Sequence, residues 1–250
     1  FIRMRKILKL ISKLCLIYFL PPIKRRIDNS LKNLNLLKED IENGISNSYV
    51  NIRFNLSDIS KKEYKKVQNS FNNLLKTHIV WRITSTSEVD QVKERSSASS
   101  AITRVPTEIS LDQLVGIRCD TKAFLLKSNR GIKMGRNIFI YPGFLVISFS
   151  ENQFEIVELS KMELTFDISN FLENDFKPKD SEVIGKEWLY QNKDGTRDFR
   201  FAGNREIPLV RYGTIYISNK KDFSAEYMFS NAEYARKFYL NLKSFIDSIN

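Results

Sequence analysis

Hydrophobic positions in the first third of the chain recur every three to four residues, which is the spacing of amphipathic helices. In the first such stretch Lys6, Lys9 and Lys13 fall opposite the apolar positions. We expect this helix to end at Pro21-Pro22, because proline inside a helix removes a hydrogen bond and clashes with the preceding turn. Its apolar side comprises Ile7, Leu8, Leu10, Ile11, Leu14, Cys15, Ile17 and Tyr18.

Two further helices are predicted downstream. One covers residues 24–43 and stops at Asn43-Gly44, and the other covers residues 61–76 and is capped by Asp58 or Ser60. Their apolar stripes are Ile27, Leu31, Leu34, Leu37 and Ile41 in the first, and Tyr64, Val67, Phe71 and Leu74 in the second.

From about Leu114 the pattern changes to short aromatic and β-branched runs separated by turn signals such as Tyr141-Pro142-Gly143-Phe144, which predicts strands. The polar, serine-rich stretch 88–100 before this region predicts a linker. A final amphipathic helix is predicted from Ser230 or Asn231 to the end. The strands expected along the whole chain are residues 49–54, 79–84, 123–127, 137–141, 144–149, 153–159, 162–168, 209–218 and 224–229.

An antiparallel β meander closed by one amphipathic C-terminal helix resembles bacterial pleckstrin-homology-like domains in the order of its elements. The expected fold class is therefore α+β, with a helical N-terminal region before a pleckstrin-homology-like meander or barrel. A lipocalin-like barrel or an α+β sandwich shares much of the pattern. The expected segments are a basic amphipathic arm (1–26), a helical region with a short strand and the polar linker (27–110), and the β domain with its C-terminal helix (111–250).

The charge of the chain is concentrated at one end. The formal net charge is +11, and the first 26 residues hold eight basic residues and no acidic one, which leaves +3 for the rest. Their uncharged run is too short for a transmembrane helix. We therefore expect the arm to lie on an anionic membrane surface through its lysines and the Lys24-Arg25-Arg26 cluster.

Three other interpretations of the arm stay open. The helix could dock on the protein's own core or pair with the next helix, or it could be a truncated signal peptide that lacks a small-residue cleavage site. The chain begins with Phe1, so Met4 is an alternative start residue.

The single histidine and two cysteines exclude several chemistries. Four-ligand zinc sites need clustered histidine and cysteine that His78, Cys15 and Cys119 do not provide. A Ser-His-Asp or Cys-His catalytic site would have to use His78. His78 opens an alternating run and predicts a strand-entry residue. No phosphate-binding glycine loop is present, so no cofactor is expected. Two distant cysteines favour a reducing compartment, which predicts a cytoplasmic protein at or near the inner face of the membrane.

The segment from Trp188 to Pro208 is dense in unusual residue types. It reads Trp-x-Tyr-x-Asn-Lys-x-Gly-x-x-Asp-x-Arg-Phe-x-x-Asn-Arg-x-x-Pro and is followed by Tyr212-Gly213. This pattern, with the upstream turn Ile140-Tyr141-Pro142-Gly143, resembles a segment of a poorly characterised bacterial family. The resemblance implies a neighbourhood of folds and no activity.

Two interpretations of this motif compete. In the structural one, Asp194-Gly195 makes a tight turn and Asp198 accepts from Arg200 or Arg205. Four aromatic residues then pin the loop to the sheet: Trp188, Tyr190, Phe199 and Phe201. In the functional one, the motif is a recognition surface for an acidic group or a peptide. The candidate residues are Trp188, Tyr190, Asn192, Lys193, Asp194, Asp198, Arg200, Asn204, Arg205 and Tyr212.

A metal-dependent hydrolase is the enzymatic alternative. It would use Asp194, Asp198 and Glu206, and it requires these carboxylates to converge on one ion.

A second basic cluster joins two predicted strands. Lys127, Arg130, Lys133 and Arg136 occur there without an acidic residue, and the matching loop binds phosphoinositide headgroups in some pleckstrin-homology-like domains. A solvated loop is the plainer interpretation. Nucleic-acid binding, as an accessory protein, is a weaker alternative because the body is nearly neutral.

The sequence as a whole predicts a non-enzymatic binding or scaffold protein of bacterial type. Its expected partners are an unknown protein or an anionic headgroup.

Overall fold

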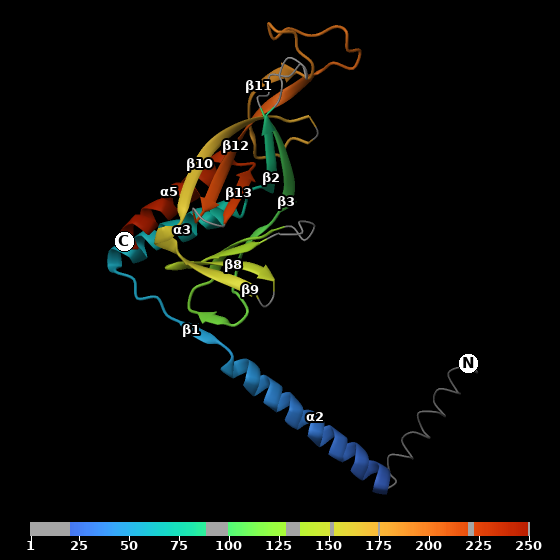
Figure 1. Cartoon of the computed structure of the whole chain (residues 1–250), viewed down its shortest axis with the longest axis vertical. Helices are drawn as coiled ribbons and strands as arrows, with labels where there is room; N and C mark the ends of the chain where they lie inside the picture. Colours follow the sequence, from blue (N-terminus) through green and yellow to red (C-terminus); the bar gives the residue numbers. More distant parts are fainter. Residues whose placement is uncertain are drawn as a thin grey trace, which may run out of the picture. The chain divides into compact units, whose positions relative to one another are not determined.

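The structure is a computed structural model that describes residues 21–88, 100–128, 136–150, 153–174, 176–219 and 223–249. It separates into two compact units (Figure 1). The smaller comprises the chain up to Asn51 together with Gly116–Arg118, and the larger comprises Ile52–Val115 and Cys119–Asn250. These boundaries differ from the predicted 26/27 and 110/111 divisions, because residues 52–110 belong with the β domain.

In its described residues, the smaller unit contains a long helix and a two-stranded sheet. Helix α2 spans Pro21–Asn47, and strand β1 (Val50–Ile52) pairs with β5 (Ile117–Cys119). Pro21 and Pro22 begin α2, where their fixed backbone angle suits the first turn. The predicted arm before them lies outside the described residues.

The larger unit holds a six-stranded sheet whose order is β10-β12-β13-β2-β3. The sixth strand, β11, pairs with the first part of the long strand β12, and β13 pairs with its second part. All of its pairings are antiparallel. The strands are β2 (Val80–Glu88), β3 (Ser100–Thr107), β10 (Glu163–Leu172), β11 (Glu182–Trp188), β12 (Glu206–Ser218) and β13 (Ser224–Phe229).

A five-stranded antiparallel sheet follows in the order β4-β6-β7-β8-β9. Its strands are β4 (Ile109–Asp112), β6 (Ala123–Leu126), β7 (Asn137–Ile140), β8 (Phe144–Ser150) and β9 (Gln153–Glu158), and the short 3-10 helix η1 (Leu159–Lys161) leads into β10. The predicted strands of this meander are confirmed. No ladder joins the two sheets in the described part of the chain, so the predicted barrel closure is wrong there.

Helices α3 (Asp58–Leu74) and α5 (Ala232–Ile249) pack beside each other over the core. The cap of α3 is Ser57, whose hydroxyl accepts from the backbone N–H of Ser60 at 3.1 Å, and not the predicted Asp58 or Ser60. Asn231 caps α5 as predicted, since its side-chain oxygen accepts from the N–H of Tyr234 at 2.9 Å.

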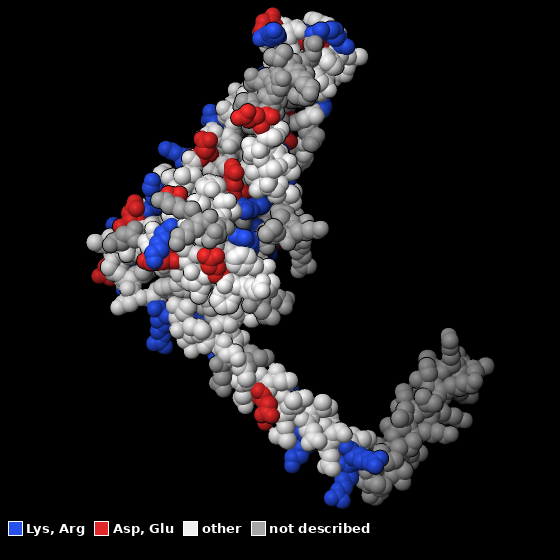
Figure 2. All heavy atoms as spheres, in the orientation of Figure 1, with Lys and Arg blue, Asp and Glu red and all other residues white. Residues whose placement is uncertain are grey.

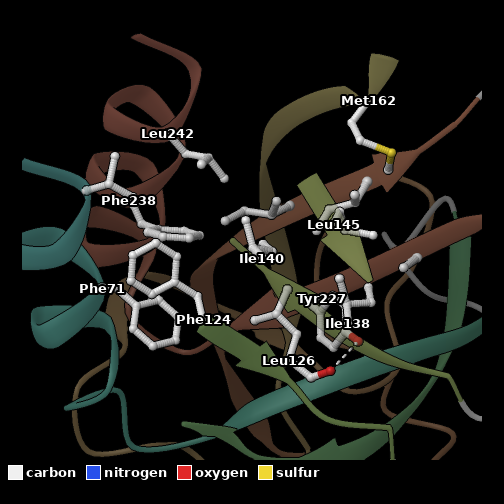
Figure 3. Close-up of a cluster of buried hydrophobic side chains, with 14 of the residues drawn as sticks. Phe71, Phe124, Leu126, Ile138, Ile140, Leu145, Met162, Tyr227, Phe238 and Leu242 are labelled. Atoms are coloured by element: carbon white, nitrogen blue, oxygen red, sulfur yellow. Dashed lines mark hydrogen bonds between the residues drawn. The ribbon is translucent and has the colours of Figure 1, made fainter. Parts of the chain in front are cut away.

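The main core joins both helices to both sheets (Figure 3). Phe71 of α3, Phe124 of β6 and Phe238 of α5 form an aromatic cluster with ring centroids 4.6 to 5.9 Å apart. The predicted stripe of α3 is buried in this core, at 7% exposure or less.

A second, smaller cluster lies on the opposite face of the six-stranded sheet. Because side chains alternate along a strand, Ile215 and Ile217 of β12 face the helices while Val210 and Tyr212 face the other way. Trp81 and Met228 join the latter pair. This second face carries the groove described next.

Candidate functional site

A half-open groove of about 1230 Å³ lies in the larger unit, where the β2–β3 hairpin passes into β4 of the other sheet. The link Pro106–Ile109 forms part of its wall. Leu75, Trp81 and Phe176 supply apolar lining. Four charged residues also line it: Arg104, Glu108, Lys127 and Glu173.

Among the charged residues that line the groove, Arg104 is held in place by several contacts. Its guanidinium carbon lies 4.1 Å from the ring centroids of both Trp81 and Phe171, so the cation is held between two aromatic faces. The side chain of Arg104 is only 14% exposed. A planar cation stacked in this way has little freedom to turn.

Glu173 binds both Arg104 and Tyr212. Its Oε2 accepts from Arg104 Nη2 at 2.5 Å and from the hydroxyl of Tyr212 at 2.8 Å. Burial is the main cause that raises the pKa of Tyr212, and the bond to the Glu173 carboxylate adds to it. A neutral phenol, a carboxylate and a guanidinium therefore form one fixed, charge-balanced cluster.

The opposite wall carries a second ion pair and hydrogen bonds between neighbouring segments. Lys127 Nζ donates to Glu108 at 2.9 Å, and the hydroxyl of Thr107 donates to the carbonyl of Lys127 at 2.6 Å. Ser128 N–H donates to the side chain of Asn137 at 2.8 Å. The two ion pairs leave the groove close to neutral.

Two hydroxyls of lining residues, Thr77 Oγ1 and Ser128 Oγ, are shielded from solvent and have no hydrogen-bond partner among the described residues. An unpaired buried hydroxyl costs about 1–3 kcal/mol.

His78 lines the same groove and is held by backbone and side-chain bonds. Its N–H donates to Asp180 Oδ2 at 2.9 Å, and its Nδ1 accepts from the N–H of Lys179 at 3.3 Å. Its ring lies 5.9 Å from that of Phe176. His78 and Ile79 are the two residues before β2, in agreement with the prediction that His78 lies at the entry of a strand.

The motif segment folds into a loop held by its own residues. Asn204 clamps it, because its side-chain nitrogen donates to the carbonyls of Tyr190 (2.7 Å) and Asp198 (3.0 Å) and its oxygen accepts from Tyr190 N–H (3.1 Å). Tyr190 and Phe201 stack at 4.1 Å. Asp194-Gly195 forms the predicted turn, with φ of +80° at Gly195.

Other contacts of the motif depart from prediction. Phe199 is 82% exposed, so it does not pin the loop, although its ring lies 5.2 Å from the guanidinium of Arg197, which also approaches Trp188. Arg205 donates to Asn174 instead of Asp198. Tyr212 lies apart from the loop, in the cluster under Arg104.

The three carboxylates of the hydrolase alternative have separate partners. Asp198 accepts from Arg200 Nε at 2.9 Å and Nη2 at 2.8 Å, which raises the pKa of Arg200. Asp194 accepts from Thr196, which lowers the pKa of this carboxyl, and Glu206 lies 3.7 Å from Lys186. Among the described residues, no three histidine, cysteine or acidic side chains are grouped as metal ligands.

The basic candidates are dispersed. Lys24, Arg25 and Arg26 are exposed in the first turns of α2, and Lys193 is exposed in the motif loop. Arg136 lies over the ring of Phe149 at 4.6 Å. Lys6, Lys9, Lys13, Arg130 and Lys133 lie outside the described residues.

The sequence interpretation missed Arg104, Trp81, Glu173 and Thr77. Only Glu173 carried a signal, as an acidic residue directly after the apolar pair Phe171-Leu172. The other three lie in β3 (Arg104), in β2 (Trp81) and just before β2 (Thr77), and the pairing of β2 with β3 brings Arg104 beside Trp81.

None of the described helices is both long enough and apolar enough to cross a membrane. Comparisons with protein-family models, curated proteins and solved structures found no match to the chain.

Proposed function

We propose that this chain is a non-enzymatic binding protein whose groove beside Arg104 takes a short extended segment of a protein partner. The observation that carries the proposal is a half-open groove of about 1230 Å³ in which the exposed side chains of Phe176 and Leu75 share the lining with the fixed Arg104–Glu173 ion pair. Ligand pockets commonly combine apolar walls with a few placed polar groups.

The lining favours a peptide over a charged small molecule. Arg104 and Lys127 are each neutralised by a carboxylate, so the groove offers no strong net charge for an anion. Phe176 and Leu75, which are 55% and 37% exposed, offer apolar surface to side chains. Strand β3 contributes lining residues and, as the end strand of its sheet, has a ladder only with β2 in the described residues, which leaves its other edge for main-chain pairing.

The element order of the larger unit supports the finer proposal of a pleckstrin-homology-like domain. The meander β6–β9 is followed by β10, β12 and β13 of the second sheet and then by α5. In this proposal α3 and the β2–β3 hairpin are additions that build the groove wall. Specificity for the partner would then come from α3 and the β2–β3 hairpin and not from the elements shared with pleckstrin-homology-like domains.

The peptide proposal is tested with peptides selected from a phage-displayed random library on the full chain. Phe176→Ala removes apolar groove lining, and Phe154→Ala is the matched control because both rings are 55% exposed and Phe154 lies on β9, outside the groove. We expect about tenfold weaker peptide binding for Phe176→Ala only. Equal affinities of both variants, or failure to select any peptide, would refute the proposal.

A second candidate function, membrane attachment through the N-terminal residues, is supported by their charge. Eight basic and no acidic residues in the first 26 positions would attract an anionic surface by about 1 kcal/mol for each basic residue near it. Sedimentation with phosphatidylserine vesicles should fall when Lys6, Lys9 and Lys13 become Glu. Unchanged sedimentation, or none for the parent chain, would remove this candidate.

A further inference from the structure

We propose that α2 is a dimerisation helix, which pairs antiparallel with α2 of a second copy of this chain. The proposal starts from five apolar residues that form one stripe along α2 and are between 38 and 61% exposed: Ile27, Leu31, Leu34, Leu37 and Ile41. Their steps of three and four residues keep them on one side of the helix. A single helix in water gains little by exposing such a stripe, whereas two helices bury it against each other.

The charges of α2 are divided by halves. Residues 21–34 contain four basic residues and one acidic residue, and residues 35–47 contain one basic residue and three acidic residues. Figure 2 shows the basic side chains at the N-terminal end of α2 and acidic ones nearer its C-terminal end.

This distribution opposes the helix's own dipole. The first turn of α2 has no acidic residue and the last turn has no basic one. Acidic residues near the N-terminus and basic ones near the C-terminus would stabilise an isolated helix. The observed charge distribution therefore does not stabilise α2 as an isolated helix, but it is complementary to a partner helix that runs in the opposite direction.

A second copy that runs antiparallel supplies that polarity. Arg26 and Asp40 flank the stripe on one side, and Lys24 and Glu42 flank it on the other. Both pairs of positions are symmetric about residue 33. A two-fold axis at Asn33 therefore sets Arg26 opposite Asp40 of the partner and Lys24 opposite its Glu42, with the two stripes against each other. A parallel pair would set basic against basic.

The first experiment measures the mass of the full chain by sedimentation velocity over a range of concentrations. We expect a reversible dimer whose dissociation constant rises by about tenfold or more in Leu34→Asp. Leu36→Asp is the matched control, because Leu36 is 51% exposed on the same helix but lies about 180° around it from Ile27. A monomeric parent chain, or equal effects of both substitutions, would overturn the proposal.

The second experiment tests the orientation by exchanging charges. Arg26→Glu and Asp40→Arg should each weaken the dimer about three- to tenfold, since each replaces two opposite-charge contacts with two like-charge contacts. The double variant should recover the parent affinity. Lys32→Glu, which changes the net charge as much as Arg26→Glu does but away from the stripe, should have a smaller effect.

Failure of the double variant to recover would overturn the antiparallel pairing. If Leu34→Asp instead lowers vesicle binding or thermal stability while the mass stays that of a monomer, a membrane or the chain itself covers the stripe, and the dimer proposal is wrong.

Discussion

Single polar residues in this protein are held in two different ways. In the motif loop, Asp198 and Asn204 bond to residues within 14 positions of themselves in the sequence. Around Arg104, by contrast, Glu173 directly follows β10 and Tyr212 lies in β12, 69 or more positions further along the chain. The sequence predicted the local Asp198–Arg200 pair, but not the Asn204 clamp or the non-local cluster around Arg104.

Asn204→Ala should destabilise the larger unit by about 2–3 kcal/mol, because three hydrogen bonds are lost and the backbone groups of Tyr190 and Asp198 are left without that partner. Urea denaturation followed by circular dichroism measures the change. Lys193→Ala, an exposed substitution in the same loop, should stay within about 0.5 kcal/mol of the parent. Equal effects would mean that the clamp contributes little.

Alkaline pH should weaken the fold through its buried tyrosines. Burial raises the pKa of Tyr227 to about 12, and its hydroxyl lies 3.4 Å from the carbonyl of Leu126. Because the folded pKa lies above the unfolded value of about 10, this contribution to stability is complete below pH 10 and is lost as pH rises towards 12.

Denaturation midpoints between pH 9 and about pH 12 check this prediction. Tyr227→Phe should show a shallower decline with pH than the parent, whereas Tyr216→Phe, at a residue 37% exposed, serves as the control. Parallel declines in parent and Tyr227→Phe would contradict the assignment.

At the scale of elements, strands and helices with strong periodicity were predicted and weaker ones were not. The meander strands and the stripe of α3 have alternation or helical spacing that needs no tertiary information. Strand β3 contains Pro106 and was missed. An end strand tolerates proline, because its outward N–H needs no ladder partner, but sequence alone cannot say that this strand lies at the end. The groove was not predicted either, because β3 contributes to its lining and the position of β3 in the sheet cannot be read from the sequence.

The contact between β12 and α5 depends on Gly213. A Cβ at this position would lie 2.9 Å from the Cβ of Ala235 and 3.0 Å from the backbone of Ala232. Gly213→Ala should therefore cost about 1–3 kcal/mol as α5 is displaced.

Gly203→Ala is the control for this substitution, since nothing lies within 4 Å of a Cβ there. Thermal unfolding of the two variants compares them directly. A Gly213→Ala protein as stable as Gly203→Ala would show that α5 shifts at no cost.

At the scale of the whole molecule, the β domain depends on residues that precede it in the sequence. Strand β2 forms a ladder with β13, and Phe71 and Leu74 of α3 are fully buried in the core. The sequence interpretation placed these residues in a separate helical region because their local pattern is helical. The long-range pairing that joins them to the sheet leaves no local trace.

A fragment of residues 111–250 should therefore fail to fold cooperatively, whereas residues 52–250 should unfold in one transition close to that of the parent chain. Loss of α3 alone, which removes Phe71, would expose Phe124 and Phe238 to water. Urea titration of both fragments decides the matter, and a cooperative transition in the shorter one would contradict it.

The pairing of α3 with α5 also sets an order of events during protein synthesis. The hydroxyl of Ser60 donates to the carbonyl of Ser248, 188 positions later, so α3 meets its partner helix only after α5 has been synthesised. Until then the apolar side of α3 has no partner helix, and the nascent chain is open to aggregation. Folding of the larger unit is thus completed only after α5 has left the ribosome, and a chain that stops before α5 would stay unfolded.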